Sequence, residues 1–221
     1  MRTRIKFCGM VRSSDVDTAA ALGVDAIGLV FHPGSSRFLA LDDALALRRR
    51  VPSWVAVVGL FVDPAEDLLA RTVARVGLDV VQFHGNESPA ECAWALAAGV
   101  PYWRAVRVRG QADLLESFAR FPAAEAFIAD SWSSDFGGSG KHFDWSLIPQ
   151  QRPPRLILAG GLTVANVGRS IAQVGPAGVD VSSGIQGADP REKDSRKMAR
   201  FVQEVLLADA RREAVNGEGD Q

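Results

Sequence analysis

Apolar and polar positions alternate in blocks along the whole chain. Short apolar runs rich in Val, Ile and Leu are separated by segments of helical length that carry polar residues. Such runs predict buried strands, and the intervening segments predict helices. The runs expected to form strands are residues 5–8, 26–31, 55–62, 80–83, 102–108, 127–129, 155–159 and 178–181. The segments expected to form helices are residues 13–22, 41–50, 63–76, 88–98, 111–120, 164–173 and 191–210.

This order of elements predicts an α/β protein with a single (β/α)8 TIM barrel over residues 1–208. Eight strand–helix units of about 25 residues each fill the roughly 200 residues that such a barrel needs. An open, doubly wound sheet is the alternative, but it usually has fewer strands and a G-x-G-x-x-G turn after the first one. Here that turn reads Gly9-Met10-Val11. The polar end of the chain, residues 209–221, is expected to be a disordered tail.

Composition and charge narrow the possible partners. The 221 residues are 47% hydrophobic and 23% charged, with a formal net charge of -1, which favours neither a nucleic acid nor a membrane as partner. The chain has no signal-peptide pattern and no apolar stretch of the roughly 18 residues that a membrane span needs, so a cytoplasmic location is expected. Two cysteines and three scattered histidines predict neither a disulfide framework nor a metal site. The sequence does not distinguish a monomer from a homodimer.

The active site of such a barrel lies at the carboxyl-terminal ends of its strands. Polar residues gather at these predicted ends, although the strands themselves are largely apolar. The candidates there are Cys8, His32, Asp63, His84, Arg107, Asp130, Gly160, Gly161, Ser182, Ser183 and Gly184. A barrel held together by packing alone would not need polar groups at these positions, so they indicate a binding or catalytic site.

Cys8, at the tip of the first predicted strand, is a candidate catalytic base. Side chains alternate along a strand, so Lys6 shares its face, and closure of the barrel brings Asp180 beside Lys6. An ammonium close to a thiol favours the thiolate, so we expect Lys6 to lower the pKa of Cys8. A small buried hydrophobic side chain is an equally good interpretation of Cys8 from the sequence alone. Cys92, inside a predicted helix, is expected to be plain core.

Asp130 is a candidate general acid. It ends an otherwise apolar strand, a setting that can raise the pKa of a carboxyl group and keep it protonated. Capping the following loop is the more common role of an aspartate at such a position. However, Cys8 and Asp130 end the first and sixth predicted strands, on facing arcs of the rim. A base and an acid on opposite sides of a pocket suit proton transfer on a carbonyl or imine substrate.

Two turns that follow the seventh and eighth predicted strands are candidates for phosphate binding. One contains Gly160 and Gly161, and the other contains Ser182, Ser183 and Gly184. Turns after these two strands frequently hold a phosphate with backbone N–H groups, and glycine lets the backbone approach the anion. A single Gly-Gly pair could merely form a tight turn. Two such turns, after the seventh and eighth strands, favour a phosphate-binding site.

Further residues are expected to contact a substrate. Arg37, after the second predicted strand, can clamp a carboxylate with two parallel hydrogen bonds. Gln82 and His84 share one face of the fourth strand, and with Asp180 they are expected to bind substrate rather than to react. The glycine-rich segment 135–141 lacks the G-x-x-x-x-G-K-[ST] pattern of a nucleotide-binding loop. It is expected to be a mobile loop over the site, and a plain solvated loop is the alternative that its composition allows almost as well.

Ordered motifs cover the chain to about residue 201. They are Lys6-Phe7-Cys8-Gly9, Gly28-Leu29-Val30-Phe31 with Ser36-Arg37, Gly59-Leu60-Phe61-Val62, Val81-Gln82-Phe83-His84-Gly85, Asp130 with Phe136 to Trp145, Ala159-Gly160-Gly161-Leu162 with Asn166-Val167, and Val179 to Gly184 with Lys193-Asp194. Each motif alone is weak, but the ordered set resembles the phosphoribosylanthranilate isomerase family of tryptophan biosynthesis.

The resemblance implies a (β/α)8 barrel that converts N-(5-phospho-β-D-ribosyl)anthranilate to 1-(2-carboxyphenylamino)-1-deoxy-D-ribulose 5-phosphate by an Amadori rearrangement. It implies that Asp130 protonates the ribose ring oxygen and that Cys8 removes the proton from C2. It also implies that Arg37 holds the anthranilate and that the two turns hold the phosphate. No metal and no organic cofactor is implied; the expected partner is a small phosphorylated substrate.

Two stretches depart from the family pattern. Gln186 stands where the family usually has glutamate, and Pro190-Arg191-Glu192 replaces a Pro-Gly turn with one extra residue. One alternative function is the isomerisation of an aminoaldose phosphate of histidine biosynthesis, for which a carboxylate pair is typical where this chain has Cys8. Another is a catalytically silent barrel that binds a phosphorylated ligand; such a protein would be expected to lose Cys8 or Asp130.

Overall fold

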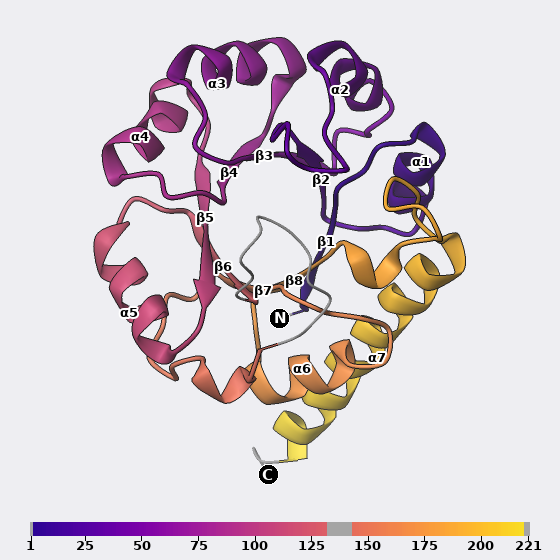
Figure 1. Ribbon diagram of the computed structural model, residues 1–221. Helices are drawn as coiled ribbons and strands as arrows, with labels where there is room; N and C mark the ends of the chain where they lie inside the picture. Colours follow the sequence, from indigo (N-terminus) through magenta and orange to yellow (C-terminus); the bar gives the residue numbers. More distant parts are fainter. Residues whose placement is uncertain (1, 132–142, 219–221) are drawn as a thin grey trace.

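Eight parallel strands form a closed barrel in the order β1 to β8, and helices surround it (Figure 1). The structure is a computed structural model that describes residues 2–131 and 143–218, so the predicted loop over 135–141 lies outside the described residues. The strands are β1 (Arg4–Cys8), β2 (Ala26–Val30), β3 (Ala56–Phe61), β4 (Val80–Phe83), β5 (Tyr102–Val108), β6 (Ala126–Ser131), β7 (Leu156–Leu158) and β8 (Gly178–Val181). The helices are α1 (Ser13–Ala21), α2 (Leu41–Arg48), α3 (Glu66–Thr72), α4 (Pro89–Ala97), α5 (Gln111–Arg120), α6 (Val167–Val174) and α7 (Ser195–Glu218).

Pairing between the first and last strands closes the barrel. The register of β1 with β8 places Lys6 beside Asp180 and Phe7 beside Val181. The (β/α)8 prediction is therefore confirmed, and the open sheet is excluded. In the described part of the chain, no helix is both long and apolar enough to cross a membrane.

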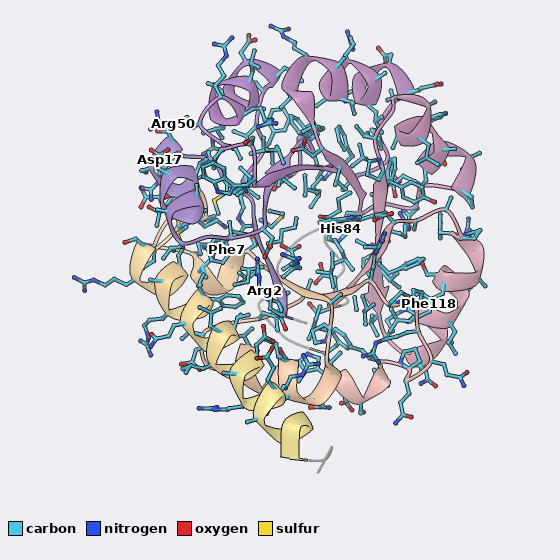
Figure 2. The ribbon with its side chains drawn as sticks, turned by 180° about the vertical axis from the view of Figure 1, so that it is seen from behind. Arg2, Phe7, Asp17, Arg50, His84 and Phe118 are labelled. Atoms are coloured by element: carbon cyan, nitrogen blue, oxygen red, sulfur yellow. The ribbon has the colours of Figure 1, made fainter. Side chains whose placement is uncertain are left out.

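Successive side chains of each strand point alternately outward and inward, so the protein has one core between strands and helices and a second core inside the barrel. Outward-facing residues pack against the helices: Phe7 is fully buried, and its ring lies 6.0 Å from that of Phe201 in α7 (Figure 2). Inward-facing residues such as Ala105, Ile128 and Ile157 fill the barrel itself. Because this inner core is apolar, the polar side chains that face inward need partners from neighbouring strands or from a ligand.

The last helix is longer than the sequence predicts. It runs to Glu218 instead of ending near Ala210. Asp209, which was assigned to the tail, is buried and accepts hydrogen bonds from Thr3 N and Thr3 Oγ1, both at 2.6 Å. The prediction of a disordered tail from residue 209 is therefore wrong as far as Glu218. This contact anchors α7 to the start of β1, and local composition gives no sign of a bond between residues so far apart in the chain.

Candidate active site

One pocket at the carboxyl-terminal ends of the strands brings together almost all of the predicted site residues. Those that line it are Cys8, Arg37, Gln82, His84, Asp130, Gly160, Gly161, Asp180, Ser182 and Ser183. Gly184 is the exception, because it packs against the backbone carbonyl of Leu162 and does not face the pocket. The position of the site at the strand ends agrees with the sequence prediction, while the chemical role of each residue stays a prediction.

Two other strand-end candidates do not line this pocket. Asp63 accepts a hydrogen bond from Asn86 N at 2.6 Å, and its own N–H donates to Glu87 Oε1 at 2.9 Å. Arg107 donates to Asn86 Oδ1 at 2.8 Å and lines a neighbouring cavity. Asp63 and Arg107 thus join the segments that follow β3, β4 and β5. His32, in contrast, does line the pocket.

Cys8 lies at the tip of β1, and Lys6 lies below it on the same face. Lys6 Nζ is 2.8 Å from Asp180 Oδ2, and both side chains are buried, which confirms the predicted pair. Gly28 of β2 gives the thiol and the ammonium their space: a Cβ there would lie 2.8 Å from Cys8 Sγ and 3.2 Å from Lys6 Nζ. A side chain at position 28 would therefore displace the thiol from the pocket.

The pKa of the Cys8 thiol is raised above its ordinary value overall, although Lys6 lowers it as the sequence predicts. Burial of Cys8 is the main cause, and the nearby Asp180 carboxylate also raises the pKa. Lys6 and Lys193 lower the pKa of Cys8 but do not outweigh burial. Burial also favours neutral Lys6, yet Asp180 and Cys8 raise the pKa of Lys6 overall. Lys6 therefore stays charged, but its charge is largely compensated by Asp180.

The Asp130 carboxylate makes two different contacts at the end of β6. Oδ1 accepts a hydrogen bond from Ser131 N at 2.7 Å, the local contact expected of an aspartate that caps a loop. Oδ2 lies 3.2 Å from Nε2 of His84, a residue inside the barrel (Figure 2). Gln82 Nε2 lies 3.4 Å from His84 Nδ1. The Gln82 amide nitrogen is a donor, so His84 Nδ1 acts as the acceptor in this contact. The imidazole proton is then on Nε2, which donates to Asp130 Oδ2.

The turn after β7 lies close against Asp130, the candidate acid. Gly160 and Gly161 have φ angles of 76° and 66°, a conformation that favours glycine. A Cβ on Gly160 would also lie 2.8 Å from Asp130 Oδ1. Asn166 holds the turn: its Oδ1 accepts from Thr163 N at 2.8 Å and its Nδ2 donates to Gly161 O at 3.0 Å. Within the described residues the Gly161 N–H has no hydrogen-bond partner, so it is available to an anion.

The turn after β8 is bonded to the strand that carries the candidate base. Ser182 Oγ donates to the backbone carbonyl of Cys8 at 2.9 Å. A single 3-10 turn, Ser183–Ile185, follows directly. The candidate phosphate turn and Cys8 therefore hold fixed positions relative to each other.

Arg37 reaches the pocket from the segment between β2 and α2. Its Nη2 donates to Gln186 Oε1 at 2.6 Å, and its Nε donates to Pro190 O at 3.2 Å. Gly9, with a φ angle of 71°, lies directly under the side chain, where a Cβ would collide with Arg37 Cδ. Both acceptors are neutral, so the guanidinium keeps an uncompensated charge that suits a carboxylate.

Sequence comparison decides the family of the chain. The family model described as N-(5'phosphoribosyl)anthranilate (PRA) isomerase matches residues 5–204. The chain belongs to this family. Among its relatives, the N-(5'-phosphoribosyl)anthranilate isomerase of Ralstonia nicotianae is 47% identical over 219 residues, which cover 95% of each chain. The enzyme of the same name from Dechloromonas aromatica is 44% identical and is covered to 99%, with 95% of this chain matched.

Solved structures of phosphoribosylanthranilate isomerases have the same fold. The crystal structure of the Thermotoga maritima protein superposes with a TM-score of 0.84 at 33% identity, over 92% of this chain and 98% of that one. Another crystal structure of a phosphoribosylanthranilate isomerase contains reduced 1-(o-carboxyphenylamino)-1-deoxyribulose 5-phosphate. It matches with a TM-score of 0.79 at 29% identity, over 92% of this chain and 98% of that one.

The two departures from the isomerase pattern meet at Arg37. Gln186, in place of the usual glutamate, and Pro190, in the longer turn, are the two acceptors of the Arg37 guanidinium. Arg191 Nη1 donates to the carbonyl of Ser36 at 3.0 Å. The altered segment therefore packs on the chain that carries Arg37.

Lys193 is a residue near the isomerase site to which the sequence assigned no role. It was recognised only as part of a family motif, yet its side chain is 4% exposed. Its Nζ donates to Ser182 O and to Ser182 Oγ, both at 3.2 Å. No pattern around Lys193 indicates this position, because the contact depends on how the chain after β8 folds back against the tip of β1.

Proposed function

We propose that the chain catalyses the Amadori rearrangement of N-(5-phospho-β-D-ribosyl)anthranilate in tryptophan biosynthesis, by general acid–base catalysis without a metal. The product is 1-(2-carboxyphenylamino)-1-deoxy-D-ribulose 5-phosphate. The observation that carries the proposal is the presence of Cys8, Asp130, Arg37 and both candidate phosphate turns around one pocket. Family membership supports the same reaction.

Two proton transfers make up the proposed chemistry. Asp130 gives a proton to the ribose ring oxygen, the C1–O bond breaks, and the anilino nitrogen, which keeps its hydrogen, supplies the electron pair that forms the protonated imine. Cys8, as the thiolate, then takes the proton from C2, and the electrons of that bond form the C1–C2 double bond of an enolamine. In the last step the C2 hydroxyl loses a proton while C1 gains one, which gives the ketone. The hydrogen bond from His84 Nε2 orients Asp130 Oδ2 for the first transfer.

The polar and apolar walls of the pocket fit the parts of this substrate. Val30, Leu60, Val62 and Leu162 form an apolar lining that suits an aromatic ring. Gln82 Oε1 and Asp180 Oδ1 are buried and have no hydrogen-bond partner among the described residues. Because buried acceptors without partners are costly, we assign them to hydroxyl groups of the ribose. Arg37 then takes the anthranilate carboxylate, and the Gly160–Gly161 turn takes the phosphate.

The aminoaldose isomerase of histidine biosynthesis is disfavoured by the residue at the tip of β1. That position holds Cys8, and the second carboxylate of the pocket, Asp180, is paired with Lys6 at 2.8 Å. Because one oxygen of Asp180 is occupied by the buried Lys6 ammonium, Asp180 and Asp130 do not form the pair of free carboxylates typical of that enzyme. The expected cytoplasmic location and the absence of nucleic-acid partners stay predictions.

The purified chain is expected to consume phosphoribosylanthranilate, which is followed as the decay of anthranilate-type fluorescence. The decay should persist after dialysis against a chelator, because both proton transfers are assigned to side chains. Asp130→Asn, purified identically, reports any isomerase carried over from the expression host. The absence of decay with a folded wild-type chain would rule out the proposed reaction, and loss of activity after chelation would rule out its metal-free form.

Replacing Arg37 by methionine is expected to raise KM by about 10- to 100-fold with a smaller change in kcat. The carboxylate would lose a charged hydrogen bond of about 1.5–3 kcal/mol, and each 1.4 kcal/mol corresponds to about tenfold in affinity. Steady-state kinetics with the anthranilate substrate and with its aniline counterpart, which lacks the carboxylate, separate this effect from general damage. An equal rise in KM for both substrates would contradict the assignment of Arg37 to the carboxylate.

A further inference from the structure

Lys193 is a buried ammonium group without a carboxylate partner. Its side chain is 4% exposed, and within the described residues no aspartate or glutamate oxygen lies within salt-bridge distance of Nζ. The two hydrogen bonds from Nζ both go to neutral acceptors of Ser182. Burial of a charge is costly unless an opposite charge compensates it. The position of Lys193 therefore indicates an anion that forms beside it.

Ser182 connects Lys193 to Cys8. Its Oγ accepts from Lys193 Nζ at 3.2 Å and donates to the Cys8 carbonyl at 2.9 Å. Lys6 also lies beside Cys8, but its charge is paired with Asp180 at 2.8 Å. Lys6 lowers the pKa of Cys8 more than Lys193 does, but its carboxylate partner Asp180 acts in the opposite direction. Of the two lysines beside the thiol, Lys193 is the one whose charge no carboxylate pairs with in the described part of the chain.

We propose that Lys193 is a positioning residue whose positive charge stabilises the thiolate form of Cys8. This inference rests on the proposed function, in which the Cys8 thiolate removes the proton from C2. When Cys8 ionises, the Lys193 ammonium acquires a nearby negative charge. The attraction between them exists only in the thiolate form, which is the form that removes the C2 proton, so it assists catalysis.

Charged groups from every element around Lys193 affect its protonation. The pKa of Lys193 is lowered to about 8, mainly by burial and secondly by the charge of Arg37. Cys8, Asp15 in α1 and Asp180 in β8 act in the opposite direction. Asp15 does not pair with the ammonium, because its Oδ2 accepts from the Lys193 backbone N–H at 3.0 Å. Neutral pH lies below the pKa of Lys193, so the amine is protonated and carries the positive charge that stabilises the thiolate.

The test is the ionisation of Cys8 in Lys193→Met, Lys193→Arg and Lys197→Met. Thiolate absorbance near 240 nm is titrated with pH in each full chain, and the curve of the matching Cys8→Ser double variant is subtracted. Cys92 does not interfere, because burial raises its pKa to about 12. Lys197 is the matched control: it is exposed, four positions away, and its Nζ donates to Gln186 O at 2.8 Å.

At pH values below about 8, where Lys193 is charged, Lys193→Met is expected to lower the thiolate fraction of Cys8 by at least about tenfold, which corresponds to about one pH unit, the lower end for loss of a nearby opposite charge. In the same pH range kcat should fall by a similar factor. Lys193→Arg keeps the positive charge and should restore part of the shift, while Lys197→Met should match the wild type. An unchanged Cys8 titration in folded Lys193→Met would overturn the inference. The titration uses no substrate, so it is independent of whether wild-type turnover confirms the proposed function.

A second measurement covers the case in which Lys193→Met does not fold. The chain has four lysines, so lysine labelled with 13C at Cε gives a signal for Lys193 that can be resolved and titrated. Coupling between two ionising groups is reciprocal. The Lys193 signal of the wild type should therefore show a step that coincides with ionisation of Cys8, and Cys8→Ser should abolish that step. Identical Lys193 titrations in the wild type and Cys8→Ser would overturn the inference.

Discussion

Replacement of Asp130 by asparagine is expected to lower kcat by at least about 100-fold, the lower end for loss of a general acid. The amide has almost the shape of the carboxyl group and retains an oxygen that can accept from Ser131 N, the 2.7 Å contact of the native side chain. It has no proton to give to the ribose ring oxygen at neutral pH. Ring opening would then depend on water, and the fluorescence assay would show the loss directly.

The competing explanation, that Asp130 only caps the loop after β6, makes a different prediction. Asp144 provides the comparison, because its Oδ1 also accepts a backbone N–H from the following segment, Ser146 N at 2.9 Å, outside the pocket. If capping were the main role, Asp130→Asn and Asp144→Asn would both keep the capping contact and would both leave kcat and the melting temperature nearly unchanged. We expect instead that only Asp130→Asn loses turnover while it keeps a melting temperature close to that of the wild type.

The parts of the structure that the sequence predicts are those governed by local rules. Apolar runs with turn residues between them locate the strands, because burial on both faces of a parallel strand leaves a continuous apolar run. The Lys6–Asp180 pair is also predicted, since it follows from a period of two along β1 and from closure of the barrel onto β8. The same reasoning places Cys8 and Asp130 at one rim, because every strand of the barrel ends on the same side.

The parts that the sequence does not predict depend on burial and on contacts between distant segments. Alternation places Lys6 beside Cys8, but the direction of the Cys8 pKa shift depends on how deeply the thiol is buried and on the compensation of Lys6 by Asp180. The partners of Arg37, Gln186 and Pro190, lie 149 and 153 positions later in the chain. Lys193 reaches Ser182 only after the segment that follows β8 turns back.

The end of α7 illustrates the same limit for the fold. From Asp209 onward the composition is polar and predicts disorder, because the hydrophobicity of this stretch is too low to drive packing. The bond that orders this part of the helix comes from Thr3, at the opposite end of the chain. A buried carboxylate that accepts two hydrogen bonds is a tertiary feature, and a window of neighbouring residues contains no information about its donor.

Replacement of Cys8 by alanine is expected to lower kcat by at least about 100-fold, because no other group at the tip of β1 can take the proton from C2. Cys8→Ser should be impaired similarly, since a hydroxyl at that position has a far higher pKa than a thiol. Because burial raises the pKa of Cys8, only a small fraction is thiolate at neutral pH, and wild-type kcat/KM should increase with pH below that pKa.

Cys92→Ala is the matched control for this prediction. Cys92 is fully buried in α4 and does not line the pocket, so its loss should lower stability while kcat and its pH dependence stay close to the wild type.

The Cys8 and Asp130 variants also separate the two proton transfers. Asp130→Asn should leave the alkaline rise of the pH profile in place at a lower rate, since the base is intact, whereas Cys8→Ala should abolish that rise. Near-normal turnover in Cys8→Ala would show that another group removes the C2 proton, and it would do so without contradicting the proposed reaction.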